Sequence, residues 1–117
     1  SYGFDAQRPG WGVPIHQLMV DNGVTAFFHG HDHQYAYEVY DGIVYQELPS
    51  PSMMGPGFNL YSENDPYTKK VLPNAGHLRV TVDATRVTVD YVRAEVGQNA
   101  AGNGQVAFSY TIDAAKR

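Results

Sequence analysis

Three of the five histidines in this 117-residue chain lie within five positions, at His29, His31 and His33. Neutral imidazole is the commonest metal ligand in proteins, and alternate residues of an extended backbone point to the same side of it. Gly30 allows the backbone to bend between the first two rings. The residue types and their spacing therefore indicate a metal site with imidazole nitrogens among its ligands.

Hydrophobic spacing predicts the elements that precede this cluster. The apolar run 24–28 ends at the histidines and is typical of a buried strand. A helix is expected before it, because Pro14 suits a first helical turn and Asn22-Gly23 a left-handed stop. Residues 1–12 show no periodicity and are expected to form a loop. The apolar face of the helix would carry Trp11, Ile15, Leu18 and Met19.

A hairpin is predicted directly after the cluster. Two β-rich runs, 35–40 and 43–48, flank Asp41-Gly42, and such a pair favours a two-residue turn in which both positions have positive φ. Residues 49–74 are interrupted by prolines and glycines and are predicted to be a long loop. This loop would either line a cleft near the metal or cover a sheet edge. Alternation along the second run puts Ile43, Tyr45 and Glu47 on one face and Val44, Gln46 and Leu48 on the other.

The last third of the chain reads as antiparallel β-structure. The pentapeptide Arg-Val-Thr-Val-Asp occurs at 79–83 and again at 86–90, which predicts a hairpin whose turn begins at Asp83. Residues 96–104 are polar and glycine-rich and are expected to form a loop. Alternating apolar residues between 106 and 112 predict a final strand.

Composition limits the classes of function. With 43% hydrophobic and 17% charged residues, the chain has the composition of one globular domain. A net charge of −4 gives no electrostatic support for nucleic-acid binding. The absence of cysteine excludes disulfides and thiolate ligands. No apolar run reaches the roughly 18–20 residues that a membrane-spanning helix needs.

The histidine cluster also carries a resemblance to a known family. Gly30-His31-Asp32-His33, placed after an apolar strand, resembles the last metal-binding motif of the calcineurin-like metallophosphoesterases. Residues 14–18 are similar to the helix before that strand in bacterial members, and residues 41–47 to the hairpin after it. The resemblance covers residues 8–52, and from residue 76 onward it is mainly a pattern of strands.

The resemblance implies a metal-dependent phosphoesterase. Two divalent cations, such as manganese, iron or zinc, would lie about 3.5–4 Å apart and promote attack of a metal-bound hydroxide on a phosphoester substrate. His31 would bind one cation and His33 the other. No general acid or base is assigned within this chain. Side chains expected beside the ligands or near the substrate are His29, Asp32, Arg8 and Trp11.

The other motifs of that family do not occur in the chain, namely Asp-x-His, Gly-Asp-x-x-Asp and Gly-Asn-His-Glu/Asp. We therefore interpret residues 1–117 as a single partial domain, the C-terminal part of such an enzyme, inactive by itself. The expected fold is α+β and β-rich: the C-terminal half of a four-layer α/β/β/α sandwich, with one helix and about six mostly antiparallel strands. The expected partners are the N-terminal half of the same fold, or a second copy bound through uncovered strands.

Two other functions stay open. Three closely spaced imidazoles could form a small, non-catalytic metal-binding β-domain. Nine tyrosines could indicate a β-sandwich accessory module, for example one that binds carbohydrate. Tight, stoichiometric zinc binding by the chain alone would favour the first of these. Against the second, tyrosines within strands are expected for packing. Neither His16 nor His77 falls in a motif, and both are expected to be ordinary structural histidines.

Overall fold

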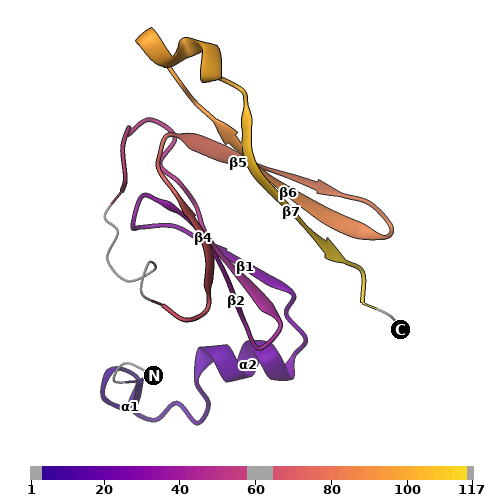
Figure 1. Cartoon of the computed structure of the whole chain (residues 1–117). Helices are drawn as coiled ribbons and strands as arrows, with labels where there is room; N and C mark the ends of the chain where they lie inside the picture. Colours follow the sequence, from indigo (N-terminus) through magenta and orange to yellow (C-terminus); the bar gives the residue numbers. More distant parts are fainter. Residues whose placement is uncertain (1–3, 58–64, 116–117) are drawn as a thin grey trace.

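The computed structural model describes residues 4–57 and 65–115 of the chain. Within these residues, seven strands form two sheets that face each other, and the helix α2 (Ile15–Asp21) lies at one end of the first sheet (Figure 1). The first sheet has the order β1 (Ala26–His29), β3 (Ile43–Glu47), β2 (Tyr35–Tyr40), β4 (Thr68–Leu72). The second has the order β5 (Gly76–Val82), β6 (Arg86–Arg93), β7 (Val106–Asp113). All paired strands are antiparallel except β1 and β3, so the fold is β-rich α+β with two mostly antiparallel sheets.

The helix expected after Pro14 is confirmed as α2, but its predicted apolar face is wrong in part, because Trp11 lies before the helix and Ile15 and Leu18 are exposed. Two short helices lie in stretches that were expected to be loop: α1 (Phe4–Gln7) and a 3-10 helix (Gly97–Gly102). The prediction of loop at these positions is wrong because helices of one or two turns are too short to show apolar periodicity. No helix in the described part of the chain has the length and apolar character needed to cross a membrane.

Both predicted hairpins are confirmed. Asp41 and Gly42 connect β2 to β3 with φ angles of 48° and 77°, as their residue types require. The β5–β6 turn begins at Asp83, whose side-chain oxygen Oδ1 accepts hydrogen bonds from the backbone N–H groups of Thr85 and Arg86. This turn contains no glycine. Hydrogen bonds from the backbone N–H groups of the turn to the Asp83 side chain stabilise it instead.

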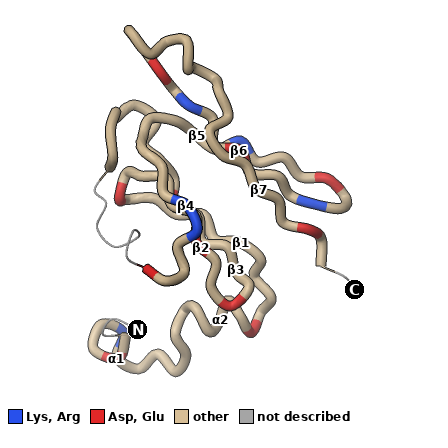
Figure 2. Tube along the Cα trace, in the orientation of Figure 1, with Lys and Arg blue, Asp and Glu red and all other residues tan. Residues whose placement is uncertain are grey.

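The prediction of an unbroken loop over 49–74 is wrong, because β4 lies inside it and pairs with β2. Pro66 and Pro73 lie on either side of β4 and no proline lies within it, so the prolines of this stretch do not prevent a strand at Thr68–Leu72. Lys69 and Lys70 are exposed and place positive charge along this edge strand (Figure 2). Lysine on an edge strand is a common way to discourage pairing with other chains. Residues 58–64 of the predicted loop lie outside the described residues.

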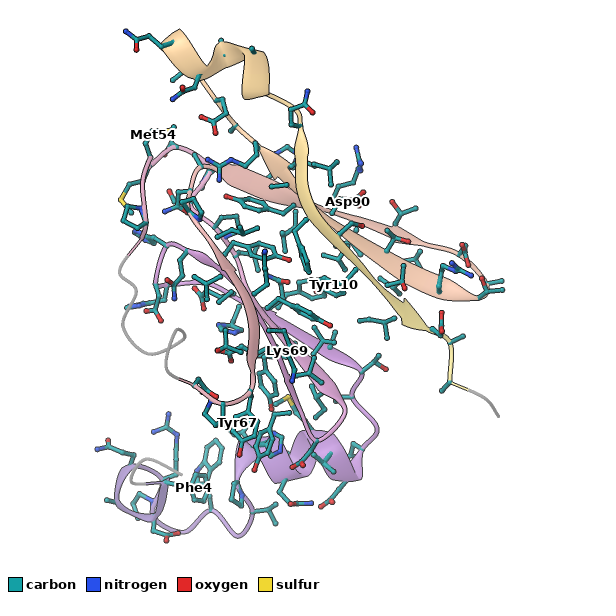
Figure 3. All side chains as sticks on the ribbon, in the orientation of Figure 1. Phe4, Met54, Tyr67, Lys69, Asp90 and Tyr110 are labelled. Atoms are coloured by element: carbon teal, nitrogen blue, oxygen red, sulfur yellow. The ribbon has the colours of Figure 1, made fainter. Side chains whose placement is uncertain are left out.

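Stacked tyrosines form the layer between the two sheets. The rings of Tyr35 and Tyr91 stack with centroids 4.6 Å apart, and those of Tyr37 and Tyr110 with centroids 4.2 Å apart. Tyr110 lies between the two sheets (Figure 3). Burial raises the pKa of Tyr35 and Tyr110, and their hydroxyl groups have no hydrogen-bond partner among the described residues. Apolar residues buried in the same layer are Val44 and Val89. These four tyrosines therefore pack the core, as is expected of aromatic residues in strands.

Candidate metal centre

The histidine cluster connects two strands of the first sheet, β1 and β2, which both pair with β3. His29 is the last residue of β1, and β2 begins at Tyr35, so residues 29–33 connect the end of an edge strand to an inner strand. We refer to residues 29–33 as the histidine turn. Because β1 runs parallel to the central strand β3, both strands end at the same edge of the sheet, and His29 lies opposite Glu47.

Glu47 binds the histidine turn at two points. Its oxygen Oε2 lies 2.5 Å from Nδ1 of His29, and its oxygen Oε1 accepts a hydrogen bond of 3.0 Å from the backbone N–H of Asp32. The Glu47 side chain is only 6% exposed, so burial raises the pKa of its carboxyl group, while the Asp32 N–H and the His29 ring act in the opposite direction. The backbone adds a further contact, since the N–H of Leu48 donates to the carbonyl of His29 at 2.7 Å.

A second buried side chain holds the other end of the turn. The amide nitrogen Nδ2 of Asn74 donates to the carbonyl oxygen of His33, and its oxygen Oδ1 accepts from the backbone N–H of Ser50 at 2.8 Å. Asn74 is 1% exposed. Gly57 also contacts this end, because a Cβ atom at position 57 would overlap the His33 carbonyl oxygen. The close approach of the two backbones therefore requires glycine at position 57.

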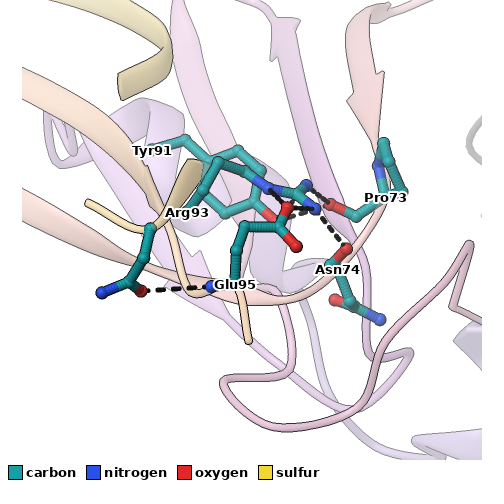
Figure 4. Close-up of polar contacts among 6 residues, drawn as sticks. Pro73, Asn74, Tyr91, Arg93 and Glu95 are labelled. Carbon is teal, nitrogen blue, oxygen red and sulfur yellow. Dashed lines mark hydrogen bonds and ion pairs between the residues drawn. The ribbon is translucent and has the colours of Figure 1, made fainter. Parts of the chain in front are cut away.

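Asn74 is in turn fixed by the second sheet. The Arg93 guanidinium donates to the carbonyl oxygens of Pro73 and Asn74 at 2.5 and 2.6 Å, and it pairs with Glu95 at 2.7 Å (Figure 4). The Tyr91 hydroxyl donates to the same Pro73 carbonyl at 2.5 Å. This network on β6 links the histidine turn to the sheet on the opposite side of the core.

The backbone of the turn adopts conformations that are unusual for its residues. His31 has φ 123° and His33 has φ 54°, both in the region that favours glycine. Such conformations cost on the order of 1–3 kcal/mol each and persist where the surroundings hold them. Here the contacts of Glu47 and Asn74 with the turn supply that restraint.

The two predicted ligands, His31 and His33, are both exposed at this turn. The side chain of His31 is 90% exposed, and its Nδ1 lies 3.1 Å from Oδ1 of Asp32. Asp32 therefore lies directly beside one of the predicted ligands. His29, by contrast, has one ring nitrogen bound to Glu47, and its ring stacks against Phe27 with centroids 5.6 Å apart.

The remaining candidates lie elsewhere. Arg8 packs over the Trp11 ring, 5.7 Å from its centroid, and Trp11 also contacts Phe4 edge-on. These residues precede α2 and pack against one another. His16 on α2 stacks on Tyr40 with ring centroids 4.2 Å apart, and its two ring nitrogens lie 2.5 Å from the Tyr45 hydroxyl and 2.8 Å from Oδ2 of Asp41. His16 thus binds the helix to the hairpin, which is a structural role.

Sequence reasoning missed two residues that hold the turn, Glu47 and Asn74. A signal for Glu47 did exist, because alternation placed a carboxylate on the same strand face as Ile43 and Tyr45. A charged residue at such a position needs a specific partner. Nothing in the sequence indicates the contact between Asn74 and His33, which are 41 residues apart.

Among the described residues, no group of three or more histidine, cysteine, aspartate or glutamate side chains is placed to hold a metal ion. Comparison with models of known protein families gives no match, and comparison with curated proteins also gives none. A functional assignment therefore has to come from the chemistry of the histidine turn and its supporting residues.

Proposed function

We propose that the histidine turn supplies two ligands of a dinuclear, metal-dependent phosphoesterase, with His31 binding one divalent cation and His33 the other. The observation that carries this proposal is the turn itself. A Gly-His-Asp-His segment follows a strand, exposes both imidazoles, and keeps a positive φ at each of these histidines. Strained backbone held by buried side chains is found preferentially at functional sites.

The chemistry of these donors fits the proposed cations. Imidazole is a ligand of intermediate softness that suits zinc and iron, and carboxylates extend the choice to manganese. When bound, a pair of divalent cations would neutralise charge on the phosphate oxygens and lower the pKa of a coordinated water. The residues of this chain would bind and orient: His31 and His33 as ligands, Asp32 beside the His31 ring, and Glu47 and Asn74 as supports of the turn.

Such a centre needs more ligands than two imidazoles, and no group of three or more histidine, cysteine, aspartate or glutamate side chains among the described residues is placed to hold a metal ion together. We propose that the missing carboxylate and amide ligands come from polypeptide that pairs with the edge strand β1, either the N-terminal half of the same fold or a second copy. Phe27 and Phe28, 42% and 39% exposed, point to opposite faces of this edge strand. Exposed apolar side chains on both faces of an unpaired strand favour addition of a further strand.

Titration with manganese tests the ligand assignment on the chain as it is. Paramagnetic broadening by Mn²⁺ should be strongest at the His31 and His33 rings in NMR spectra. The double substitution His31→Ala and His33→Ala should remove it. His77→Ala is the matched control, because His77 is an exposed histidine on β5, and its removal should change nothing. Broadening centred elsewhere would refute the assignment.

Two further measurements separate the alternatives. Nitrophenyl phosphate should be hydrolysed slowly or not at all by the chain alone, and robust, chelator-sensitive turnover would contradict the need for outside ligands. Equilibrium dialysis with zinc tests a non-catalytic site of three histidines, which would bind tightly and stoichiometrically. Such a site would require His29 to use only its Nε2, since its Nδ1 is bound to Glu47. Light scattering after size-exclusion chromatography tests self-association, and a thermostable monomer would count against pairing through β1.

A further inference from the structure

The carboxylate of Glu47 bonds to both sides of the bend that carries His31. One oxygen lies 2.5 Å from the His29 ring, and the other accepts the N–H of Asp32 at 3.0 Å. The residues between these two contacts are Gly30 and His31. We propose that Glu47 is a positioning residue for the metal ligands: it holds the backbone at His31 and sets the tautomer of His29. The consequence for metal affinity depends on the function proposed above, whereas the effect on the turn does not.

The first part of the proposal follows from the backbone of His31. Its φ of 123° is unfavourable for any residue with a side chain, so the flanking contacts must be strong enough to maintain it. A hydrogen bond from a backbone N–H to a buried carboxylate is among the stronger bonds in proteins, and its strength is of the same order as such strain. Because Asp32 directly follows His31, fixing the Asp32 N–H restricts the His31 backbone.

The second part follows from the hydrogen-bonding capacity of the two side chains. An ionised carboxylate can only accept, so Nδ1 of His29 must carry the hydrogen in the 2.5 Å contact with Glu47. A neutral His29 ring then has its lone pair on Nε2. Glutamine at position 47 would present an NH₂ group, which can donate to Nδ1 and so favour the opposite tautomer. The substitution Glu47→Gln therefore changes the tautomer with almost no change in shape.

Glu38 provides a matched control. It lies on β2, on the same sheet face as Glu47, and burial raises the pKa of its carboxyl group as well. Its oxygen Oε1 accepts from the Thr68 hydroxyl at 3.1 Å, so its hydrogen bond is to β4 and not to the histidine turn. Glu38→Gln therefore removes a partly buried carboxylate from this face and leaves the turn contacts in place.

The first experiment needs no metal. Long-range ¹H–¹⁵N spectra of the labelled chain at pH 8 report the tautomer of each histidine, and amide exchange reports the Asp32 N–H. We expect the Nδ1–H form of His29 and a protected Asp32 amide in the native chain and in Glu38→Gln. In Glu47→Gln we expect the Nε2–H form of His29 and exchange of the Asp32 amide at least about 10-fold faster than in the native chain. The unfolding midpoint of Glu47→Gln should be comparable to that of Glu38→Gln, so that the faster exchange reports the turn and not the stability of the whole chain.

The second experiment repeats the manganese titration with the same variants. Loss of a residue that orients metal ligands typically weakens metal binding about 10–100-fold, so Glu47→Gln should lower affinity at His31 and His33 by about that factor. Glu38→Gln should bind as the native chain does. Equal affinity in Glu47→Gln and the native chain would overturn the link between Glu47 and the ligands.

The outcomes separate the two proposals. If the native chain holds His29 in the Nε2–H form, or exchanges the Asp32 amide freely, the positioning role of Glu47 is wrong whatever the metal does. This outcome is measured on the native chain alone, so it stands even if Glu47→Gln fails to fold. If the native spectra are as expected but manganese does not broaden His31 and His33, the proposed function is wrong, and Glu47 is only a support of the turn.

Discussion

Replacing Gly57 by alanine should disturb the histidine turn at His33. The added Cβ would overlap the His33 carbonyl oxygen and lie 2.8 Å from Cβ of Gln34, closer than real Cβ contacts come. Gly57 also has a φ of +39°, where an L-residue costs about 1–2 kcal/mol. Overpacking of a rigid site adds about 1–3 kcal/mol. We therefore expect Gly57→Ala to lose about 2–5 kcal/mol of unfolding free energy.

Gly55→Ala is the control for backbone strain alone. Gly55 lies two residues earlier, has a φ of +94°, and nothing within 4 Å of the Cβ it would gain. Its substitution should cost only the strain, about 1–2 kcal/mol. Alanine also lowers the conformational entropy of the unfolded chain relative to glycine, which by itself stabilises the folded state. This effect is the same in both variants, so it cancels when their unfolding free energies are compared.

Thermal and urea unfolding followed by circular dichroism would measure both variants. A difference of about 1 kcal/mol corresponds to about 4 °C in Tm for a domain of this size. The amide resonances of His33 and Gln34 should shift in Gly57→Ala and remain in place in Gly55→Ala. Equal losses of stability in the two variants, with unchanged His33 resonances, would show that Gly57 does not pack against the turn.

Three further outcomes are expected. Asn74→Ala should cost about 2–4 kcal/mol in urea unfolding, because two part-buried backbone groups, the His33 carbonyl and the Ser50 N–H, lose their partner; a loss below about 1 kcal/mol would contradict this. Burial raises the pKa of Glu38 above its ordinary 4.5, so the folded chain should lose stability as pH rises from 4.5 through the folded pKa, and Glu38→Gln should remove that slope. The Ser109 hydroxyl, followed by Arg79, lowers the pKa of Asp90 below 3.8. The resulting stability is present above pH 3.8 and is lost as pH falls through the folded pKa; Ser109→Ala should raise the pKa in an NMR titration and reduce that loss.

Local features of the sequence were sufficient to predict α2 and both hairpins. The Asp41-Gly42 pair can form only a narrow range of turns, and the alternation on either side of it fixes which faces are apolar. The repeated pentapeptide at 79–83 and 86–90 likewise pairs as predicted. These elements are determined by neighbours in sequence, so the sequence alone indicates them.

The support of the histidine turn could not be predicted in the same way. The strand β4 was missed because an edge strand needs only one paired side, and its lysines obscure any alternation. Asn74 reaches His33 because the segment that follows β4 packs against the histidine turn and against the loop at Ser50 and Gly55. The position of that segment is set by Arg93 on β6, far away in sequence. Contacts that depend on the packing of two sheets leave no local pattern.

The parallel pairing of β1 with β3 has a consequence for how accurately the chain folds. The observed alignment places His29 opposite Glu47, with Phe28 opposite Gln46 one position earlier. If β3 slipped by one residue, its Glu47 carboxylate would turn toward the stacked tyrosines between the sheets and away from the His29 imidazole. Burial of an unpaired carboxylate there would be strongly unfavourable. The same ion pair that supports the histidine turn therefore also penalises misaligned versions of the first sheet.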